Sequence, residues 1–190
     1  MTIKIPIEIS ARHVHLAKEE MEILFGSGYE LKILKELSQP GQFAANETLT
    51  VRFGDKEIIN VRVVGPLRQK TQVEISLTDT YFLGAAATIK EDQGYMKVAP
   101  GILLIGPKGE VGLEQGALVA LRHLNASLAE AEELGIKDNE FVSIRIKGIR
   151  DLTFHNVRTK VGDQYKLSVH LDADEGNAAG LIQKGFGEIT

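Results

Sequence analysis

Four of the five histidines and one glutamate have the residue types and positions to hold a metal ion. His13 and His15 are two residues apart, so in a strand both side chains project from one face. Imidazole nitrogen is a preferred zinc ligand. Glu74 and His170 each fall on the polar side of an alternating segment, away from its apolar side. We predict a metal-centred catalytic site formed by His13, His15, Glu74, His123 and His170.

A candidate phosphate clamp lies close to this carboxylate in the sequence. Arg68 and Lys70 occupy a turn-forming segment a few residues before Glu74. A guanidinium group contacts two oxygens of a phosphoryl group at once, so an arginine beside a metal-binding carboxylate suits phosphate binding. The alternative is an ordinary solvated turn, and these residues alone leave both interpretations open.

A second metal-site pattern is also present, because His13, His15 and Glu19 match the His-x-His-x3-Glu spacing of cupin sites. Cupins continue this stretch as a strand, whereas residues 16–25 here have the apolar spacing of a helix. A helix would point Glu19 away from the two histidines. A cupin-like or hydrolytic metal enzyme that uses Glu19 is therefore a less favoured alternative.

The composition narrows the class of protein. The chain has 190 residues and a net charge of −4, so it carries no global basic field for nucleic acid. It contains no cysteine, which excludes disulfides, thiolate metal ligands and a cysteine nucleophile. No apolar run reaches the ~18 residues of a membrane span, and no signal peptide precedes the first strand. We expect a cytoplasmic protein with neither nucleic-acid nor membrane partners.

Short alternating segments typical of strands dominate the chain. The clearest covers residues 2–10, where four isoleucines alternate with other residues. Further strands are predicted at Thr48–Phe53, Glu57–Val64, Val73–Leu77, Gly101–Ile105, Val111–Leu113, Ala117–His123, Phe141–Ile146, Leu152–Thr159 and Tyr165–Leu171. Short helices are predicted at residues 18–25 and near 79–84, and residues 85–99 are predicted to form a loop. The pattern favours a mainly β fold of antiparallel barrels or sandwiches.

One segment of the sequence is repeated. Ala11–Glu20 resembles Leu121–Glu130, because in both an Arg-His pair stands at the end of a predicted strand and a short helix follows. Glycines at positions 26 and 135 stop the two helices. The repeat predicts two related halves, each contributing a histidine-bearing strand end.

Four long motifs carry a resemblance to a known family. They are Ile9–Leu16 (ISARHVHL), Leu34–Phe43 (LKELSQPGQF), Val63–Ser76 (VVGPLRQKTQVEIS) and His170–Ala179 (HLDADEGNAA). Together they resemble the PduL-type phosphate acyltransferases, also called phosphate propanoyltransferases, over almost the whole chain. The resemblance implies a reversible exchange in which a short-chain acyl-CoA and phosphate give acyl phosphate and coenzyme A.

The resemblance also implies a set of site residues. A first zinc ion would be held by His13, His15 and Glu74, and a second by His123, His170 and the residue at the position of Asn125. Arg68 would be the catalytic phosphate-binding residue. The implied coenzyme A contacts are Ser10, Lys35, Arg62, Val64 and Asn177.

The architecture that the resemblance implies is two antiparallel β-barrels with short capping helices and an interleaved chain. Residues 1–11 and 121–190 would form one barrel and residues 12–120 the other, with a small hairpin excursion around residues 26–46. Relatives sent to bacterial microcompartments carry an N-terminal encapsulation extension, which we do not expect here because the first strand starts by Ile3. A homodimer is compatible with the sequence.

Two departures from the family pattern suggest an alternative function. The second His-x-His of the family is His123-Leu-Asn125 here, and an amide oxygen is a poorer zinc ligand than imidazole. In the segment 90–94, Asp92 stands where the family has a serine. The alternative is a catalytically decayed relative that only binds coenzyme A or metal.

Overall fold

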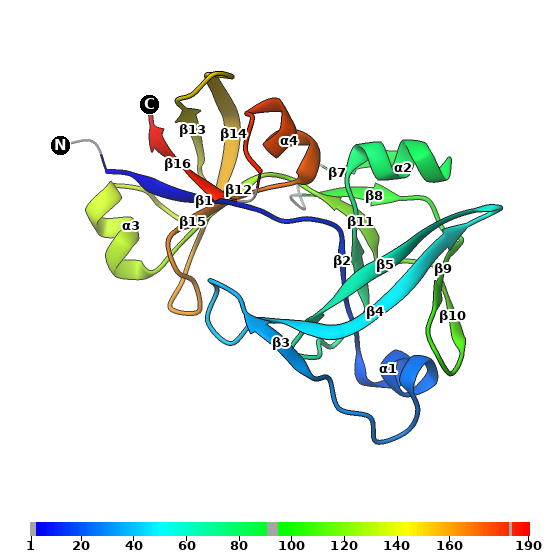
Figure 1. Ribbon diagram of the computed structural model, residues 1–190. Coiled ribbons are helices and arrows are strands. Elements are labelled where there is room, and N and C mark those ends of the chain that lie inside the picture. The colour runs from blue at the N-terminus through cyan, green and yellow to red at the C-terminus, as the bar shows by residue number, and fades with distance from the viewer. Residues whose placement is uncertain (1–2, 91–94, 183) are drawn as a thin grey trace. The chain divides into compact units, whose positions relative to one another are not determined.

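The computed structural model describes residues 3–90, 95–182 and 184–190. The chain divides into two compact units, one made of Met1–Ala11 and Leu121–Thr190 and the other of Arg12–Ala120. Each unit has its own β-sheet (Figure 1). Each also has its own cluster of buried apolar side chains. The mainly β fold class is confirmed.

The unit of residues 1–11 and 121–190 is a closed barrel. Its elements are β1 (Ile5–Ile9), β12 (His123–Ala126), α3 (Leu128–Leu134), β13 (Phe141–Ile146), β14 (Leu152–Val161), β15 (Ser168–Leu171), α4 (Ala173–Ala178) and β16 (Lys184–Ile189). The strand order around the barrel is β1-β15-β12-β14-β13-β16. Ile5 and Ile7 are fully buried, so β1 presents the predicted alternating face to the barrel core.

The unit of residues 12–120 is built on a larger sheet. Its elements are β2 (His13–His15), α1 (Lys18–Phe25), β3 (Ile33–Glu36), β4 (Phe43–Phe53), β5 (Lys56–Gly65), β6 (Gln72–Glu74), α2 (Leu77–Leu83), β7 (Ala87–Lys90), β8 (Tyr95–Val98), β9 (Ile102–Ile105), β10 (Glu110–Leu113) and β11 (Ala117–Ala120). The strand order is β10-β9-β4-β5-β2-β6-β11-β8-β7, with β3 paired to β4.

The predicted second barrel is not confirmed, because in the described residues of this unit the sheet does not close on itself. Closing a barrel needs two strands with free edges at its ends. Here β9 pairs with the outer edge of β4, and β7 pairs with the outer edge of β8. The corresponding closure in the other unit is made by the pairing of β13 with β16.

Within each unit, six strands follow the same order. The order β4-β5-β2-β6-β11-β8 matches β13-β14-β12-β15-β1-β16, and each pair of neighbours is parallel or antiparallel in the same places. In both units the short histidine strand is parallel to one neighbour and antiparallel to the other. This correspondence supports the duplication that the repeated segment predicts, and it makes β2 equivalent to β12 and β6 equivalent to β15.

Several local predictions are confirmed and two are wrong. The helix at Lys18–Phe25 is confirmed. Residues 85–99, predicted to be a loop, contain the strand pair β7 and β8, whose alternation is hard to see in two four-residue strands. The Arg-His pairs stand at the start of strands rather than at their ends, since His13 and His123 are the first residues of β2 and β12. Among the helices in the described part of the chain, none is long and apolar enough to cross a membrane.

Candidate metal centre

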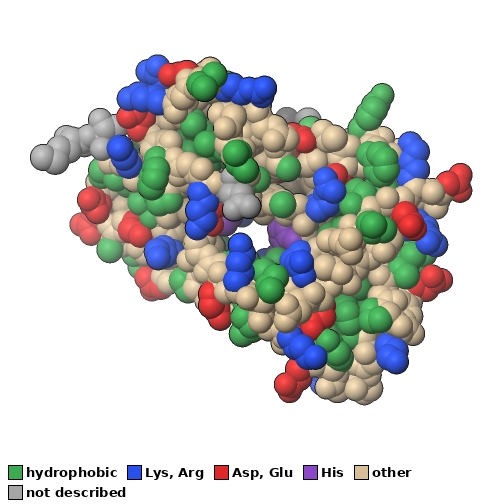
Figure 2. Space-filling model, viewed as in Figure 1, with side chains coloured by type: hydrophobic (Ala, Val, Ile, Leu, Met, Phe, Trp, Pro, Cys, Tyr) green, Lys and Arg blue, Asp and Glu red, His purple; other side chains and the backbone are tan. Residues whose placement is uncertain are grey.

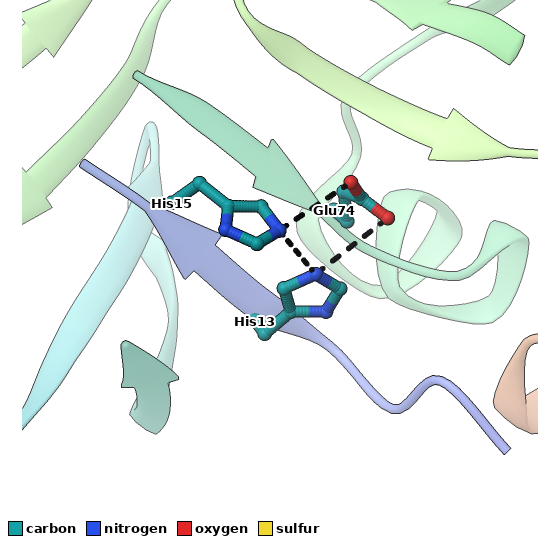
Figure 3. Close-up of side chains that lie close together, drawn as sticks. All are labelled: His13, His15 and Glu74. Carbon is teal, nitrogen blue, oxygen red and sulfur yellow. Dashed lines mark hydrogen bonds and ion pairs between the residues drawn. The ribbon is translucent and has the colours of Figure 1, made fainter. Parts of the chain in front are cut away.

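Two adjacent strands bring His13, His15 and Glu74 together. His13 and His15 are the ends of the three-residue strand β2, and Glu74 is the last residue of β6. His13 lies directly opposite Glu74 in the antiparallel register of these strands. Val14, between the histidines, is fully buried on the other face. Strand alternation therefore aims the three ligand-type side chains at one point, as Figure 3 shows.

The distances within this triad suit a shared ion. The Nε2 atoms of His13 and His15 are 3.1 Å apart, and Glu74 oxygens lie 3.6 Å from His13 Nε2 and 3.9 Å from His15 Nε2. Tetrahedral ligands at ~2.0–2.1 Å from zinc are about 3.3 Å from one another. The three residues form a group whose ligand atoms all lie within 4.8 Å of one another.

Burial keeps one of these imidazoles neutral. His15 is 2% exposed, and its Nδ1 lies 3.0 Å from the carbonyl oxygen of Val64. Desolvation, reinforced by His13 and Arg68, lowers the pKa of His15 to about 2. The neutral ring therefore donates its Nδ1–H to the carbonyl and turns the lone pair of Nε2 toward the triad. A backbone acceptor behind a ligating histidine is the usual way in which its orientation is fixed.

Arg68 lies beside the triad. Its Nη1 donates to Gln72 Oε1 at 2.6 Å and lies 4.0 Å from Glu74 Oε1. Its backbone N–H donates to the carbonyl of Leu16 at 2.8 Å, which ties the loop to the segment after β2. The side chain remains 37% exposed. A cation that is accessible and adjacent to a metal-type triad can receive an anion there.

The equivalent strands of the other unit carry the second set of predicted ligands. His123 begins β12 and lies opposite His170 of β15, and their rings stack with centroids 5.2 Å apart. Asn125, at the position equivalent to His15, lies opposite Ser168. The Nε2 of His170 contacts Ser168 Oγ at 2.9 Å. These predicted ligands therefore lie together on one face of β12 and β15.

Asn125 presents a buried oxygen of a kind that can ligate a cation. It is 4% exposed, and in the described part of the chain its Oδ1 has no hydrogen-bond partner. A buried unpaired oxygen is costly and calls for an explanation. Burial, with smaller effects from Lys160 and His170, lowers the pKa of His123 to about 3, and its Nδ1 lies 3.0 Å from the Leu121 carbonyl. The neutral ring of His123 thus matches that of His15.

Sequence reasoning missed a pair of arginine–carboxylate contacts beside the histidines. Arg12 binds the buried carboxylate of Asp79 through Nε at 3.0 Å and Nη2 at 2.8 Å. In the barrel, Arg122 Nη1 binds Glu175 Oε1 at 2.7 Å. Both acids are the third residue of a helix that begins three residues after a predicted ligand, and both close a capping box. The signal was the Arg-His repeat together with the capping patterns after Glu74 and His170.

The remaining predicted residues fall in both units. In the unit of residues 12–120, Lys35 is an exposed residue of β3, and Arg62 on β5 donates to the carbonyls of Ala45 at 3.0 Å and Asn46 at 2.8 Å. Val64 supplies the carbonyl that accepts from His15. In the barrel unit, Ser10 follows β1 and Asn177 lies on α4.

Two other predicted positions have different outcomes. Glu19 is on the helix α1 and is not part of the triad, which disfavours the cupin-like alternative. Asp92 lies outside the described residues.

Comparison with known proteins agrees with this arrangement. A model of the family described as phosphate propanoyltransferase matches residues 6–182. Relatives named phosphate propanoyltransferase include one from Thermotoga maritima, 46% identical over 92% of this chain and 83% of the relative. Those from Leptotrichia buccalis and Clostridioides difficile are 46% and 45% identical, over 96% and 97% of this chain and 86% and 88% of the relatives. The chain therefore belongs to the phosphate propanoyltransferase family of enzymes.

Proposed function

We propose that this protein transfers a short acyl group reversibly between coenzyme A and inorganic phosphate. Acyl-CoA and phosphate would give acyl phosphate and free coenzyme A. The observation that carries the proposal is the position of Arg68, whose Nη1 lies 4.0 Å from Glu74 beside two histidines. The names of the relatives support the same reaction.

The chain's own composition limits how the acyl group can move. There is no cysteine, so no acyl thioester can form on a protein thiol. The acyl carbon would pass directly between the sulfur of coenzyme A and a phosphate oxygen. Both substrates must then be bound at once, and the residues must hold an anionic oxygen and a sulfur close together.

The triad fits a zinc ion. Two imidazoles and one carboxylate converge at suitable spacings, and His15 is held neutral with its Nε2 lone pair turned inward. Zinc bound by His13, His15 and Glu74 would lower the pKa of the coenzyme A thiol and so supply a thiolate near neutral pH. The carbonyl of Val64 accepts a hydrogen bond from His15, and the side chain of Gln72 accepts one from Arg68. These two bonds orient the side chains of His15 and Arg68.

A second ion would be held by His123, Asn125 and His170. The unpaired buried Oδ1 of Asn125 is the feature that fits a cation there, because coordination would satisfy it. An amide oxygen in place of imidazole makes this the weaker of the two sites.

Arg68 would bind the phosphoryl group. Its guanidinium offers a planar pair of donors for two phosphoryl oxygens, and the bond to Gln72 keeps it directed along β6 toward Glu74. Positive charge already in place offsets charge that develops on these oxygens, without rearrangement during the reaction. The remaining family-type residues, Ser10, Lys35, Arg62, Val64 and Asn177, would contact coenzyme A.

The test combines metal analysis with a phosphate-dependent assay on one sample. A thiol reagent should detect coenzyme A released from acetyl-CoA or propanoyl-CoA only when phosphate is added, and chelation should abolish it. Arg68→Gln should reduce kcat/KM for phosphate by about 100-fold. Arg52→Gln, which removes an exposed arginine paired with Glu57 in the same unit, should leave it unchanged.

The decayed-relative alternative predicts a different result. Coenzyme A would bind by calorimetry, yet no short acyl-CoA would release it at saturating zinc. That outcome would reject the proposed activity. The buried unpaired oxygen of Asn125 is the observation that motivates this alternative.

A further inference from the structure

A pocket next to the triad is lined by an excess of cations. It has a volume of about 810 Å³ and lies within the unit of residues 12–120. Four cationic side chains line it, those of Lys18, Arg68, Lys70 and Lys97, against two carboxylates, those of Glu19 and Glu20. Glu20 already accepts a hydrogen bond from the Thr71 hydroxyl at 3.1 Å. The lining therefore favours an anion.

The pocket shares two side chains with the surroundings of the triad. Arg68 and Gln72 line it and are bonded to each other. Gln72 lies opposite His15 in the register of β2 and β6, so it projects from the same sheet face as the triad. A ligand in the pocket can thus touch the guanidinium that stands 4.0 Å from Glu74.

Lys97 stands on this face as well. Glu74 is paired with Leu118 on β11, and Leu118 is paired with Lys97 on β8. Paired residues on neighbouring strands project to the same side, so Lys97 lies two strand spacings, ~10 Å, from Glu74. Among the described residues, no carboxylate lies within 4.0 Å of the ammonium groups of Lys97 or Lys70.

The barrel contains an equivalent set of three paired residues, in which the lysine forms an ion pair. There His170 is paired with Glu8, and Glu8 is paired with Lys184. The ammonium of Lys184 lies 3.6 Å from the Glu8 carboxylate. In the pocket, the position equivalent to Glu8 is the apolar Leu118, so among the described residues this set of pairs gives Lys97 no carboxylate partner.

A local cluster of cations has more influence on an anion where the surrounding surface charge is mixed. On the face shown in Figure 2, Lys and Arg side chains are spread over the surface and mixed with Asp and Glu. An anionic substrate must then be attracted by a few grouped cations at the site itself.

The sheet order separates this pocket from the proposed coenzyme A contacts in the same unit. Lys35, Arg62 and Val64 lie on β3 and β5, and in the described part of the chain neither strand lines the pocket, whose lining includes Gln72 of β6, Lys97 of β8 and Leu118 of β11. In the sheet, strand β2 stands between β5 and the neighbouring strands β6, β11 and β8. One substrate can therefore approach from each side of the triad.

We infer that this pocket binds the phosphoryl substrate, inorganic phosphate in one direction and acyl phosphate in the other, with Lys70 and Lys97 guiding it to Arg68. The inference rests on the proposed function and adds the place and the residues by which the second substrate enters. The phosphates of coenzyme A are the other source of the same oxyanion chemistry, and the test separates the two.

The test measures KM for phosphate and for acyl-CoA separately in Lys70→Gln, Lys97→Gln and the double variant. Each single change should raise KM for phosphate about three- to tenfold, since one charge near the ligand is lost. KM for acyl-CoA should stay within about twofold of the wild-type value. Lys97→Arg, which keeps the charge, should restore phosphate affinity. Lys108→Gln is the matched control, because Lys108 is exposed in the same unit and does not line the pocket.

The outcomes distinguish this inference from the proposed function. An unchanged KM for phosphate, or a rise confined to KM for acyl-CoA, overturns the pocket assignment while the activity stands. If the wild-type protein shows no turnover, the proposed function fails. In that case, broadening of the ³¹P signal of inorganic phosphate by wild-type protein still decides the pocket assignment. Loss of that broadening in the double variant supports it, and equal broadening rejects it.

Discussion

At the scale of single residues, the position of Asn125 separates the two candidate metal sites. It occupies the place that His15 has in the duplicated unit, and its buried Oδ1 has no partner in the described part of the chain. Loss of one imidazole ligand weakens a zinc site without removing it. The two sites should therefore differ in affinity.

We expect chelator titration of the zinc-loaded protein to release one ion well before the other. Asn125→His should bring the two steps together and raise the affinity of the weaker site by about tenfold or more. Native mass spectrometry counts the bound zinc ions, and calorimetry measures the affinity of each site. Asn139→His, at an exposed asparagine of the same unit, is the control. Equal affinities in the wild-type protein would contradict the prediction.

The low pKa of His15 has a consequence for metal-free protein. The unfolded ring takes up a proton near pH 6.5, whereas the folded ring, with its pKa lowered to about 2 by burial, stays neutral. Between these values the unfolded state binds more protons, so stability rises with pH and falls as pH is lowered. The free energy of unfolding in EDTA should fall by up to about 1.4 kcal/mol per pH unit below 6.5 from this residue.

Urea titrations across pH 4–7 measure this slope. His15→Gln should have a shallower slope than the wild-type protein, because its side chain does not titrate. His155→Gln, at an exposed histidine of the barrel, should match the wild-type slope. Equal slopes for His15→Gln and wild type would show that burial of His15 does not govern this dependence.

The residue types of the site were predictable from the sequence, and the family resemblance implied the grouping of His13, His15 and Glu74, but the strand register that produces this grouping was not predictable. The spacing of His13 and His15 places them on one strand face, and Glu74 was found because it interrupts an apolar strand. Which strand would lie opposite them depends on the register of β2 with β6, a contact between segments far apart in sequence. Lys97 and Gln72 were not predicted for the same reason. Pairing through β11 places Lys97 on the same sheet face as Glu74, and pairing with β2 places Gln72 opposite His15.

At the scale of elements, the arginine–carboxylate contacts link each histidine strand to a helix. Arg12 precedes His13, and Asp79 belongs to the helix that starts after Glu74. The contact therefore ties together the two segments that carry the triad. Its repetition as Arg122 and Glu175 in the barrel indicates that the arrangement is a feature of the duplicated unit.

Asp79→Asn should lower the free energy of unfolding by about 1–3 kcal/mol, because an ion pair to the half-exposed Arg12 and a helix cap are weakened together. It should also weaken zinc binding by about tenfold at a temperature where the variant is fully folded. Glu57→Gln removes the charge of an exposed glutamate that pairs with Arg52 in the same unit. It should change neither the free energy of unfolding nor the zinc affinity. Normal zinc affinity in folded Asp79→Asn would limit the contact to stability.

The elements themselves could be predicted from sequence where their pattern was long enough. The helix α1 and the strand β1 have full periods, and both are confirmed. Strands β7 and β8 have four residues each, too few for alternation to stand out. The open sheet could not be foreseen, because the strands that occupy the edges of β4 and β8 look no different in sequence from those of a barrel.

At the scale of the whole molecule, the family resemblance inferred from four motifs is confirmed. The order in which the chain passes through the two units matches the duplication, because β1 and β11 are equivalent strands. Strand β1 precedes the unit of residues 12–120 but belongs to the barrel, while β11 precedes the barrel but belongs to the larger sheet. The barrel is therefore discontinuous in sequence, whereas the other unit is one continuous segment.

This path predicts which unit depends on the first residues. Strand β1 lies between β15 and β16, and its Ile5 and Ile7 are fully buried in the barrel core. Removing residues 1–11 would leave two strand edges unpaired and take away about 3–6 kcal/mol of apolar burial, a large part of the stability of a small domain. A chain of residues 12–190 should then lose dispersed amide signals from residues 121–190 and keep those from 12–120. A synthetic peptide of residues 1–11 should restore the lost signals, and removal of residues 1–3, which precede β1, should have no effect. Dispersed barrel signals in the 12–190 chain would mean that the barrel core forms without β1.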